Sequence, residues 1–600
     1  MDKPSALETS ADPPRTISTM STNQDIIELF EEMASLLELT GANGFRVNAH
    51  TKVARVIEGL STDLATLADD PKALEAIDGI GKSSAAKIVE YLNHGTISDL
   101  EKLRNDVPDD LVQLLKVPGL GPKTVRRLWT ELDIESLEDL KKALADGSVA
   151  ELPRMGKKSV TNLVEAIEFM ESSGGRERMG TAHEQAEAII GRLREVPGVG
   201  EIRYAGSLRR GRETIGDIDI LLHATDPAAV SEAFTSMPDV TKVLVQGETK
   251  SSVRIEAGMQ VDLRIVEEHA FGAALMYFTG SKEHNVVLRE RAISRGQRLN
   301  EYGLFPDDGE SGSPQERGVE PIAAATETDI YAALDMPYIP PELREDRGEF
   351  DAPPPADLIE VQDIRAELHS HTTASDGLLS IDELADAAIK AGRTILAITD
   401  HSKSSAQANG LDEDRLRRHV EAIHEANDRI KGLTILAGSE VDIHADGSLD
   451  YEDDVLALLD VVVASPHASL RQDPETATRR LCAALKHPLV SILGHPTGRL
   501  INERKGLEPD MDAVIAAAIE GNTALEVNSN PYRLDLRDVH VRAAVKAGAL
   551  ISINTDAHRG HQLDFVQYGV KTARRGWLGR DECINTWDEE RLVSWLNAGR

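Results

Sequence analysis

The sequence predicts a multidomain protein with three kinds of fold in order: an all-α N-terminal region, an α+β middle, and a C-terminal α/β barrel of seven strands. Residues 24–170 carry apolar side chains at helical spacing, interrupted by short glycine turns. The middle contains alternating strand-like runs such as GDIDIL, and the chain after residue 362 alternates short β-branched runs with amphipathic helices. A chain of 600 residues is also too long for one hydrophobic core.

Composition limits the classes of function. The formal net charge of −36 argues against a protein that coats DNA electrostatically, so any DNA contact needs local devices. No apolar run is long enough to span a bilayer, and residues 1–22 lack the features of a signal peptide. We therefore expect a disordered tail over 1–22, a cytoplasmic location and a monomer. The only two cysteines, Cys482 and Cys583, form no metal motif, so a metal must use His, Asp or Glu.

The helical region repeats one unit, in IDGIGKSSAAKIVEYLNHG (77–95) and in VPGLGPKTVRRLWTEL (117–132). A third copy at 152–167 has Arg154 where the first glycine stands in the others. The glycines permit a tight turn that points backbone N–H groups at a phosphate oxygen. The alternative is a plain helical hairpin. The candidate DNA-binding residues are Gly79, Gly81, Lys82, Gly119, Gly121 and Lys123.

Two strand-like runs in the middle region carry carboxylates. In GDIDIL, a period of two places Asp217 and Asp219 on one face, and Asp262 lies in a second run, MQVDLRIV. Three carboxylates on adjacent strands can hold two Mg²⁺ ions, which suits nucleotidyl transfer. Just upstream, Gly206, Ser207 and Arg210 form a loop suited to a triphosphate.

The segment YFTGSKEHNVVLRER (277–291) follows. It offers two aromatic side chains before a glycine turn and then Asn285 and Arg289, one helical turn apart. These residues can line a nucleotide pocket, although aromatic residues before a turn also occur in plain cores.

From residue 77 to residue 341, these motifs resemble family X DNA polymerases, the group that includes DNA polymerase beta. The resemblance implies that Asp217, Asp219 and Asp262 bind two catalytic Mg²⁺ or Mn²⁺ ions. It implies nucleotide contacts for Gly206, Ser207, Arg210, Gly216, Tyr277, Phe278, Gly280, Asn285 and Arg289. It also makes the first unit similar to the family's lyase domain, with Lys87 as a Schiff-base lysine. Gln260 departs from the pattern, since animal enzymes carry an arginine there.

The last region repeats a strand, a polar segment and a helix: AELHSHT, TILAITDH, LTILAGSEVDI, DVVVASPHAS, VSILGHPTGR, ALEVNSN and ALISINTDAH. In such barrels the active site lies at the C-terminal ends of the strands. The candidate metal ligands at those ends are His369, His371, Asp376, His401, Glu440, His467, His495, Asp556 and His558. Imidazole and carboxylate without thiolate suit Mn²⁺, Zn²⁺ or Fe²⁺, and such a cluster suits phosphoester hydrolysis.

This region resembles the PHP domain, the polymerase and histidinol phosphatase family, which implies a cluster of up to three ions held by those nine residues. Asp400 is expected to orient His401, and Arg499 to hold a substrate phosphate. The expected domains are the tail (1–22), a lyase-like helical domain (23–100), a helical DNA-binding domain (101–175), a nucleotidyltransferase palm (176–266), a thumb (267–341), a linker (342–362) and the PHP domain (363–600).

The combination resembles bacterial and archaeal family X polymerases with a C-terminal PHP domain. We therefore expect a gap-filling repair polymerase of the base-excision type, acting on gapped or primer-template DNA with deoxynucleoside triphosphates. Its PHP domain would remove 3′-terminal nucleotides or blocking groups and cut at abasic sites. The alternative is a DNA-targeted phosphatase or nuclease whose polymerase half only delivers DNA. A non-enzymatic DNA-binding scaffold is a third hypothesis, disfavoured by intact ligands at both sites.

Overall fold

The structure is a computed structural model that describes residues 21–58, 64–67, 71–77, 79–117, 120–152, 155–157, 159–161, 163–164, 167, 175–256 and 258–598. The chain forms two compact units, Met1–Met170 and Glu171–Arg600, which are described separately. The expected tail falls mostly outside the described residues, and the first helix begins at Ser21. Gly119 and Arg154 also lie outside them. No helix in the described part of the chain is long and apolar enough to cross a membrane.

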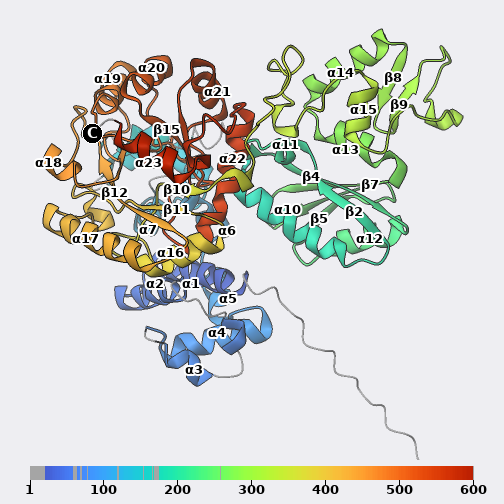
Figure 1. The fold of residues 1–600 in the computed structure, drawn as a ribbon. Helices are drawn as coiled ribbons and strands as arrows, with labels where there is room; N and C mark the ends of the chain where they lie inside the picture. The colour runs from blue at the N-terminus through green and yellow to red at the C-terminus, as the bar shows by residue number, and fades with distance from the viewer. Residues whose placement is uncertain are drawn as a thin grey trace, which may run out of the picture. The chain divides into compact units, whose positions relative to one another are not determined.

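The first unit is all α, as the helical periodicity predicts (Figure 1). Side chains such as Phe30, Ile88 and Leu128 are fully buried in one shared core, so the apolar stripes of successive helices face one another. Its α-helices are α1 (Ser21–Leu39), α2 (Gly44–Glu58), α3 (Pro71–Glu75), α4 (Lys82–His94), α5 (Ser98–Asn105), α6 (Asp109–Gln113), α7 (Pro122–Leu132) and α8 (Leu137–Asp146).

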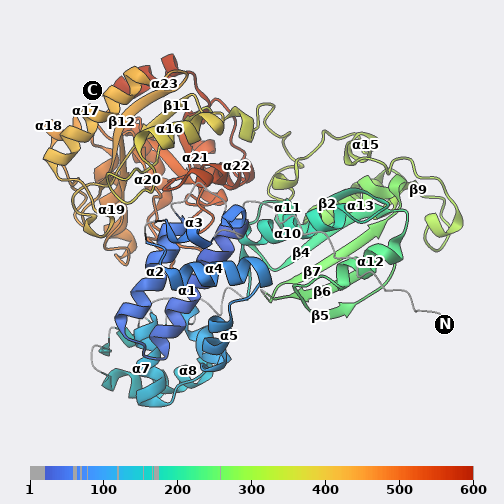
Figure 2. The same cartoon turned by 90° about the horizontal axis from the view of Figure 1, so that it is seen from below.

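The second unit begins with a five-stranded sheet in the order β2-β4-β7-β6-β5 (Figure 2). Its strands are β2 (Val199–Tyr204), β4 (Asp217–Ala224), β5 (Val240–Val245), β6 (Lys250–Ile255) and β7 (Gln260–Val266). Helices α10 (Met179–Arg194) and α12 (Pro227–Thr235) share a core with Ile218, Ile220 and Leu222 of β4. Leu221 points the other way and packs with α13 (Phe271–Thr279). One face of β4 is therefore buried by α10 and α12, and the opposite face carries the carboxylates.

A smaller α+β part follows the sheet. It comprises α14 (Lys282–Ser294), the hairpin of β8 (Gln297–Asn300) and β9 (Gly303–Pro306), and α15 (Glu327–Ala333). Buried side chains such as Leu288, Leu304 and Tyr331 join these elements to α13 in one core. The short strand β1 (Glu177–Arg178) pairs with β3 (Thr214–Ile215), and the helix α11 (Gly206–Arg209) lies between β2 and β3.

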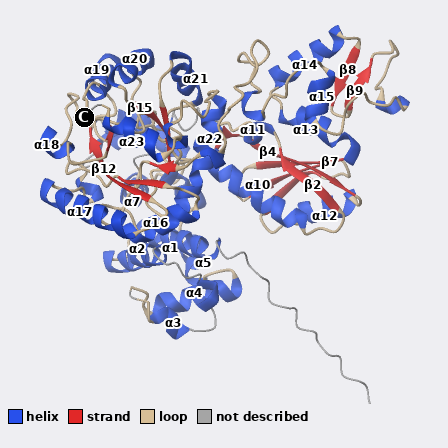
Figure 3. Ribbon diagram, in the orientation of Figure 1, coloured by secondary structure: helices blue, strands red, loops and turns tan. Residues whose placement is uncertain are grey.

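The remainder is a seven-stranded parallel sheet in sequential order, β10 to β16, with helices around it (Figure 3). An isolated bridge between Ser370 and Ala557 joins the two ends, so the sheet approaches a closed barrel. The strands are β10 (Ala366–Glu367), β11 (Ile395–Ile398), β12 (Thr434–Asp442), β13 (Val461–Ser465), β14 (Ile492–Leu493), β15 (Ala524–Asn528) and β16 (Ile551–Asn554). The helices are α16 (Ile381–Lys390), α17 (Glu413–Arg429), α18 (Asp453–Leu456), α19 (Pro474–Leu485), α20 (Met511–Gly521), α21 (Asp538–Ala547), α22 (Val566–Arg575) and α23 (Glu589–Asn597).

The helical first unit, the α+β middle and the seven-stranded barrel confirm the predicted fold class. The strands of the barrel are almost wholly buried, because helices cover a parallel sheet on its outside. The segment expected to link the barrel to the preceding part, 342–362, is packed rather than extended. Arg344 and Glu349 within it are buried, and Arg344 donates to Glu327 of α15.

Candidate functional sites

The three carboxylates of the first candidate site are brought together by strand register. In the parallel pair of β4 and β7, Asp217 lies opposite Gln260, and Asp219 lies opposite Asp262. Burial, together with the charges of Asp217 and Asp262, raises the pKa of Asp219 to about 7. Three carboxylates this close repel one another unless a cation joins them. The donor set therefore fits hard divalent ions such as Mg²⁺ or Mn²⁺.

The loop before β4 is shaped to approach these carboxylates. Gly206 has a φ of +59°, and a Cβ built on it would lie 2.1 Å from Asp219 Oδ2, so only glycine fits. The next side chain, Ser207, has a buried hydroxyl with no hydrogen-bond partner in the described part of the chain. A buried hydroxyl without a partner is costly, and a phosphate oxygen would satisfy it. Gly216 ends the loop, where a Cβ would meet Arg176 at 2.8 Å.

The arginines of this loop are already paired. Arg209 donates to both oxygens of Glu327, at 2.8 and 2.7 Å. Arg210 donates to the carbonyl of Thr279 at 2.5 Å and to Glu345 at 3.1 Å. Arg210, predicted to bind the triphosphate, is therefore already paired, and its charge acts on Asp219.

The other predicted nucleotide contacts lie on α13 and α14. Tyr277 and Phe278 stack edge to face, with ring centroids 5.3 Å apart, and Arg264 of β7 lies over the Phe278 ring. Asn285 donates to the carbonyl of Tyr277 at 2.8 Å.

Three further residues complete this side of the site. Arg289, half-buried, makes no hydrogen bond or ion pair with the described residues. The turn at Gly280 lies against Arg210: a Cβ built on this glycine would be 3.2 Å from Arg210 Nη1. Gln260, the departure from the family pattern, donates to Asp262 at 3.0 Å and so contacts a carboxylate directly.

The two glycine turns of the first unit have nearly the same geometry. Gly81 (φ −80°, ψ 165°) precedes α4, and Gly121 (φ −82°, ψ 165°) precedes α7. In both turns the residue before this glycine donates its backbone N–H to the carbonyl three residues earlier, Ile80 to Ile77 and Leu120 to Val117. Among the described residues, the backbone N–H groups of Gly81 and Gly121 at these exposed turns have no hydrogen-bond partner, as an anion-binding turn requires.

Three lysines accompany these turns. Lys82 is exposed, and Lys123 is largely exposed and 3.4 Å from Glu38. Lys87 differs from both, because it is 13% exposed and held 3.1 Å from Asp99 and 3.1 Å from the hydroxyl of Ser83.

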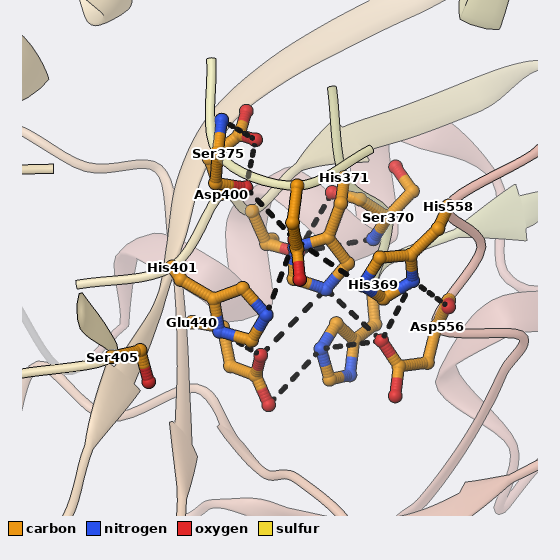
Figure 4. A network of polar contacts seen from close by, with 12 residues as sticks. His369, Ser370, His371, Ser375, Asp400, His401, Ser405, Glu440, Asp556 and His558 are labelled. Atoms are coloured by element: carbon orange, nitrogen blue, oxygen red, sulfur yellow. Dashed lines mark hydrogen bonds and ion pairs between the residues drawn. The ribbon is translucent and has the colours of Figure 1, made fainter. Parts of the chain in front are cut away.

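The second site gathers all nine predicted residues at the C-terminal ends of the barrel strands. Figure 4 shows six of them, His369, His371, His401, Glu440, Asp556 and His558. Close approaches include His371 Nε2 to Asp556 Oδ1 at 3.0 Å and His401 Nδ1 to Glu440 Oε2 at 2.9 Å. His495 reaches Glu440 at 2.8 Å. Three groups bring one ligand atom per residue within 4.8 Å of the others: His371, Asp376, His401 and His558; His369, His371, Glu440 and Asp556; and His401, Glu440 and His467.

Several of these atoms are buried without any hydrogen bond in the described part of the chain. They are His371 Nδ1 and His495 Nδ1, together with His369 Nε2, His401 Nδ1 and Glu440 Oε2, which lie within ion-pair distance of other residues of the cluster but lack hydrogen-bond geometry. Burying polar atoms unpaired is costly, whereas coordination of ions would satisfy them together. Although burial lowers the pKa of His467, the charges of Glu440 and Asp442 raise it to about 10. The residues fit a multinuclear metal centre.

Supporting residues hold these ligands, and sequence reasoning missed two of them. Glu526 of β15 lies 2.8 Å from His369 Nδ1 and accepts from the backbone N–H of His495 at 2.6 Å. Asp442 faces His467 Nδ1 at 3.0 Å. The available signal was a carboxylate inside an otherwise apolar buried strand, which requires a partner.

Two expectations change on this geometry. Asp400 accepts from the hydroxyls of Thr372 and Ser375 and lies 2.7 Å from His419 Nε2, so it shapes the loop after β10 rather than orienting His401. Arg499 donates to the carbonyl of Leu534 and pairs with Glu213, in the loop before β4, at 2.8 Å, so its charge is already matched.

Three carboxylates beneath a loop with an unsatisfied hydroxyl are the arrangement that nucleotidyl transfer needs. The buried histidine and carboxylate cluster defines a metal-dependent phosphoesterase on the same chain. Comparisons with known families agree with both assignments. Residues 21–97 match the helix-hairpin-helix domain, 95–168 the SAM-like helix-hairpin-helix tandem, 274–345 the DNA polymerase beta thumb and 367–530 the PHP domain.

One curated relative matches nearly the full length of the chain, and two others match about half of it. The DNA polymerase/3′-5′ exonuclease PolX of Bacillus subtilis (strain 168) is 40% identical over 565 residues, which cover 94% of this chain and 97% of that protein. DNA polymerase lambda of Arabidopsis thaliana is 26% identical over 348 residues, 54% of this chain and 62% of that protein. DNA polymerase lambda of Rattus norvegicus is 25% identical over 291 residues, which cover 45% of this chain and 48% of that protein. The chain belongs to the family X DNA polymerases that carry a PHP domain.

Proposed function

We propose that this protein is a DNA-directed DNA polymerase that also carries a metal-dependent 3′-5′ exonuclease. The observation that carries the proposal is the completeness of both sites on one chain: the Asp217, Asp219 and Asp262 face of the sheet, and all nine candidate ligands of the barrel. Support comes from the relative named a polymerase and 3′-5′ exonuclease.

In the polymerase site, Asp217, Asp219 and Asp262 would hold two Mg²⁺ or Mn²⁺ ions. Such ions favour ionisation of the primer 3′-hydroxyl and stabilise the leaving pyrophosphate. The chain's own contribution is orientation. The Ser207 hydroxyl and the Arg210 guanidinium bind phosphate oxygens, Tyr277 and Phe278 lie against the sugar, and Asn285 and Arg289 face the base pair. The helix-hairpin-helix turns hold the DNA backbone without reading its sequence.

In the barrel, the nine ligands would hold Mn²⁺ or Zn²⁺, with Fe²⁺ as a third choice. The cluster supplies a hydroxide at neutral pH and charge that stabilises a phosphoryl group. Glu526 and Asp442 fix the ring orientation of His369 and His467, so each imidazole presents its other nitrogen to the centre. Arg533, 3.9 Å from Asp556, adds positive charge beside the cluster for a substrate phosphate.

Within this activity we propose gap filling in base excision repair, with the barrel trimming 3′ ends, removing 3′ blocks and cutting at abasic sites. Lys87 is proposed as a lyase nucleophile from its place in the motif. Its amine is held by Asp99 at 3.1 Å and must leave that carboxylate to attack a sugar carbon. Borohydride trapping on DNA with a 5′-deoxyribose phosphate, with Lys87→Ala as control, tests this role. Cytoplasmic location and a monomeric state stay predictions.

The alternative is a nuclease or phosphatase whose N-terminal parts only deliver DNA. One substrate series separates the two hypotheses. The proposal expects nucleotide addition to a one-nucleotide gap that exceeds addition to an open primer end. It also expects removal of a 3′-phosphate by the same protein. Release of phosphate without any addition, across Mg²⁺ and Mn²⁺, would establish the alternative.

A further inference from the structure

An ionic bridge joins the predicted triphosphate loop to the barrel. Arg575, the last residue of α22, donates to Glu345 Oε1 at 2.9 Å, and the same oxygen accepts from Arg210 Nε at 3.1 Å. Arg575 also donates to the backbone carbonyl of Arg210 at 2.7 Å. A residue of the barrel thus contacts the loop that lies beside the polymerase carboxylates.

The bridge is buried. The side chains of Arg575, Glu345 and Arg210 are 4%, 9% and 14% exposed. Burial alone would raise the pKa of Glu345, but the charges of Arg575 and Arg210 outweigh it and hold the pKa below its ordinary value. Arg575 is itself fixed by Asp538 at 3.0 Å. The remaining partner of Glu345 is Arg212, which is more distant, at 3.5 Å, and half-exposed.

A triphosphate that binds Arg210 competes with Glu345 for the same guanidinium. When Arg210 turns to the phosphates, Glu345 stays behind in a buried position. A buried carboxylate without a partner is strongly unfavourable, whereas one that keeps a buried arginine is not. Arg575 is placed to be that arginine.

We propose that Arg575, a residue of the barrel, is a positioning residue for nucleotide binding at the polymerase site. It keeps Glu345 paired while Arg210 exchanges that carboxylate for the triphosphate. The proposal rests on the role proposed above for Arg210. It gives the barrel a part in polymerisation that is separate from its own metal centre.

The test measures kcat and KM for a single deoxynucleotide on a one-nucleotide gap. Arg575→Ala is expected to raise KM about tenfold with kcat within about twofold of the intact protein, because binding rather than chemistry is affected. Glu345→Gln removes the competitor and is expected to lower KM. The double variant is expected to return KM towards the wild-type value, a rescue that a purely structural role would not give.

The control is Arg574→Ala. Arg574 is the neighbouring buried arginine of α22, but it pairs with Glu342 and Glu360 and does not touch the loop. Its KM should stay at the wild-type value. An unchanged KM in Arg575→Ala, an equal rise in Arg574→Ala, or a rise in Glu345→Gln overturns the proposal.

Two arms keep the result interpretable. If Arg575→Ala does not fold, the sign of the change in Glu345→Gln decides alone, since damage to the fold does not tighten nucleotide binding. Arg210→Ala separates the role of Arg210 in nucleotide binding from the role of the bridge. A rise in KM there without changes in the Arg575 and Glu345 variants rejects only the bridge, whereas no rise rejects the role of Arg210 and the bridge with it.

Discussion

The polymerase site and the barrel site both offer ligands suited to divalent ions, but the first offers three carboxylates and the second offers histidines together with carboxylates. The polymerase carboxylates sit on two strands of an open sheet, with Asp217 exposed and Asp219 half-buried. In the barrel, ligands such as His369, His371 and Glu440 are fully buried and lie within reach of one another. The first arrangement suits ions that arrive with a nucleotide, and the second suits ions that stay.

The largest expected effect of this difference is on metal removal. After treatment with a chelator, primer extension should return at once when Mg²⁺ is added, because few protein ligands bind those ions. Primer shortening should stay lost until Mn²⁺ or Zn²⁺ is restored to the buried cluster. Metal analysis together with both activities measures this. Equal recovery of both activities with Mg²⁺ would remove the contrast.

The loop before β4 is held by buried ion pairs, such as that of Arg209 with Glu327, and not by metal ligands. The burial of Glu327 raises its pKa, but Arg344 and Arg209 lower it to about 2, from 4.5. A lowered folded-state pKa means stability that is present above pH 4.5 and lost as the pH falls towards 2. At one pKa unit per 1.36 kcal/mol, Glu327→Gln should cost about 3 kcal/mol at pH 7 and progressively less below pH 4.5.

Thermal unfolding of both proteins at pH 7, 4 and 3 checks this prediction. The control is Asp308→Asn. Asp308 also has a pKa lowered to about 2, through Arg317, but the pair is on the surface and should contribute far less. A gap between Glu327→Gln and the wild type that does not narrow at acid pH would mean the charge is not what stabilises the loop.

The barrel should depend on its supporting carboxylate. Glu526→Gln weakens the hold on His369 and should lower metal affinity about 10- to 100-fold, while extension stays at the wild-type rate. Metal titration of primer shortening measures it, with the exposed Glu520→Gln of α20 as the matched control. A loss of extension in the Glu526 variant would show that the two sites are not separable.

The smallest expected effect is at Ser207. Ser207→Ala removes the hydroxyl proposed to bind the nucleotide and should raise KM for that nucleotide about two- to tenfold, since one hydrogen bond contributes about 0.5–1.5 kcal/mol. Thermal stability should not change, because the hydroxyl has no partner in the described part of the protein. Ser231→Ala is the reverse control. Its buried hydroxyl bonds Ser251 at 2.7 Å, so it should lower stability and leave KM alone.

Much of this arrangement follows from local sequence. Alternation in GDIDIL placed Asp217 and Asp219 on one face, and the strand-end histidines marked the barrel site, because strand periodicity and chain order fix these positions. Gly206 was predicted as part of a phosphate-binding turn, but its close approach to Asp219 was not.

What escaped prediction depends on contacts between distant segments. Glu526 lies in an otherwise apolar strand, which indicates that it needs a partner, but that partner, His369, is far away in the sequence. Glu345 fell within an expected linker, yet it lies buried between Arg210 and Arg575. Asp400 directly precedes His401 in the sequence, but its side chain accepts hydrogen bonds from the loop after β10. Packing between elements sets such contacts, and no local pattern records it.

The central claim is that two independent active sites share this chain. The most direct measurement follows a 5′-labelled primer at a one-nucleotide gap with Mn²⁺, with and without deoxynucleotides, for the intact protein, Asp217→Ala and His369→Ala. We predict that lengthening disappears only in Asp217→Ala and that shortening disappears only in His369→Ala. Shortening by the intact protein without any lengthening would contradict the account and leave a nuclease with a DNA-delivering half.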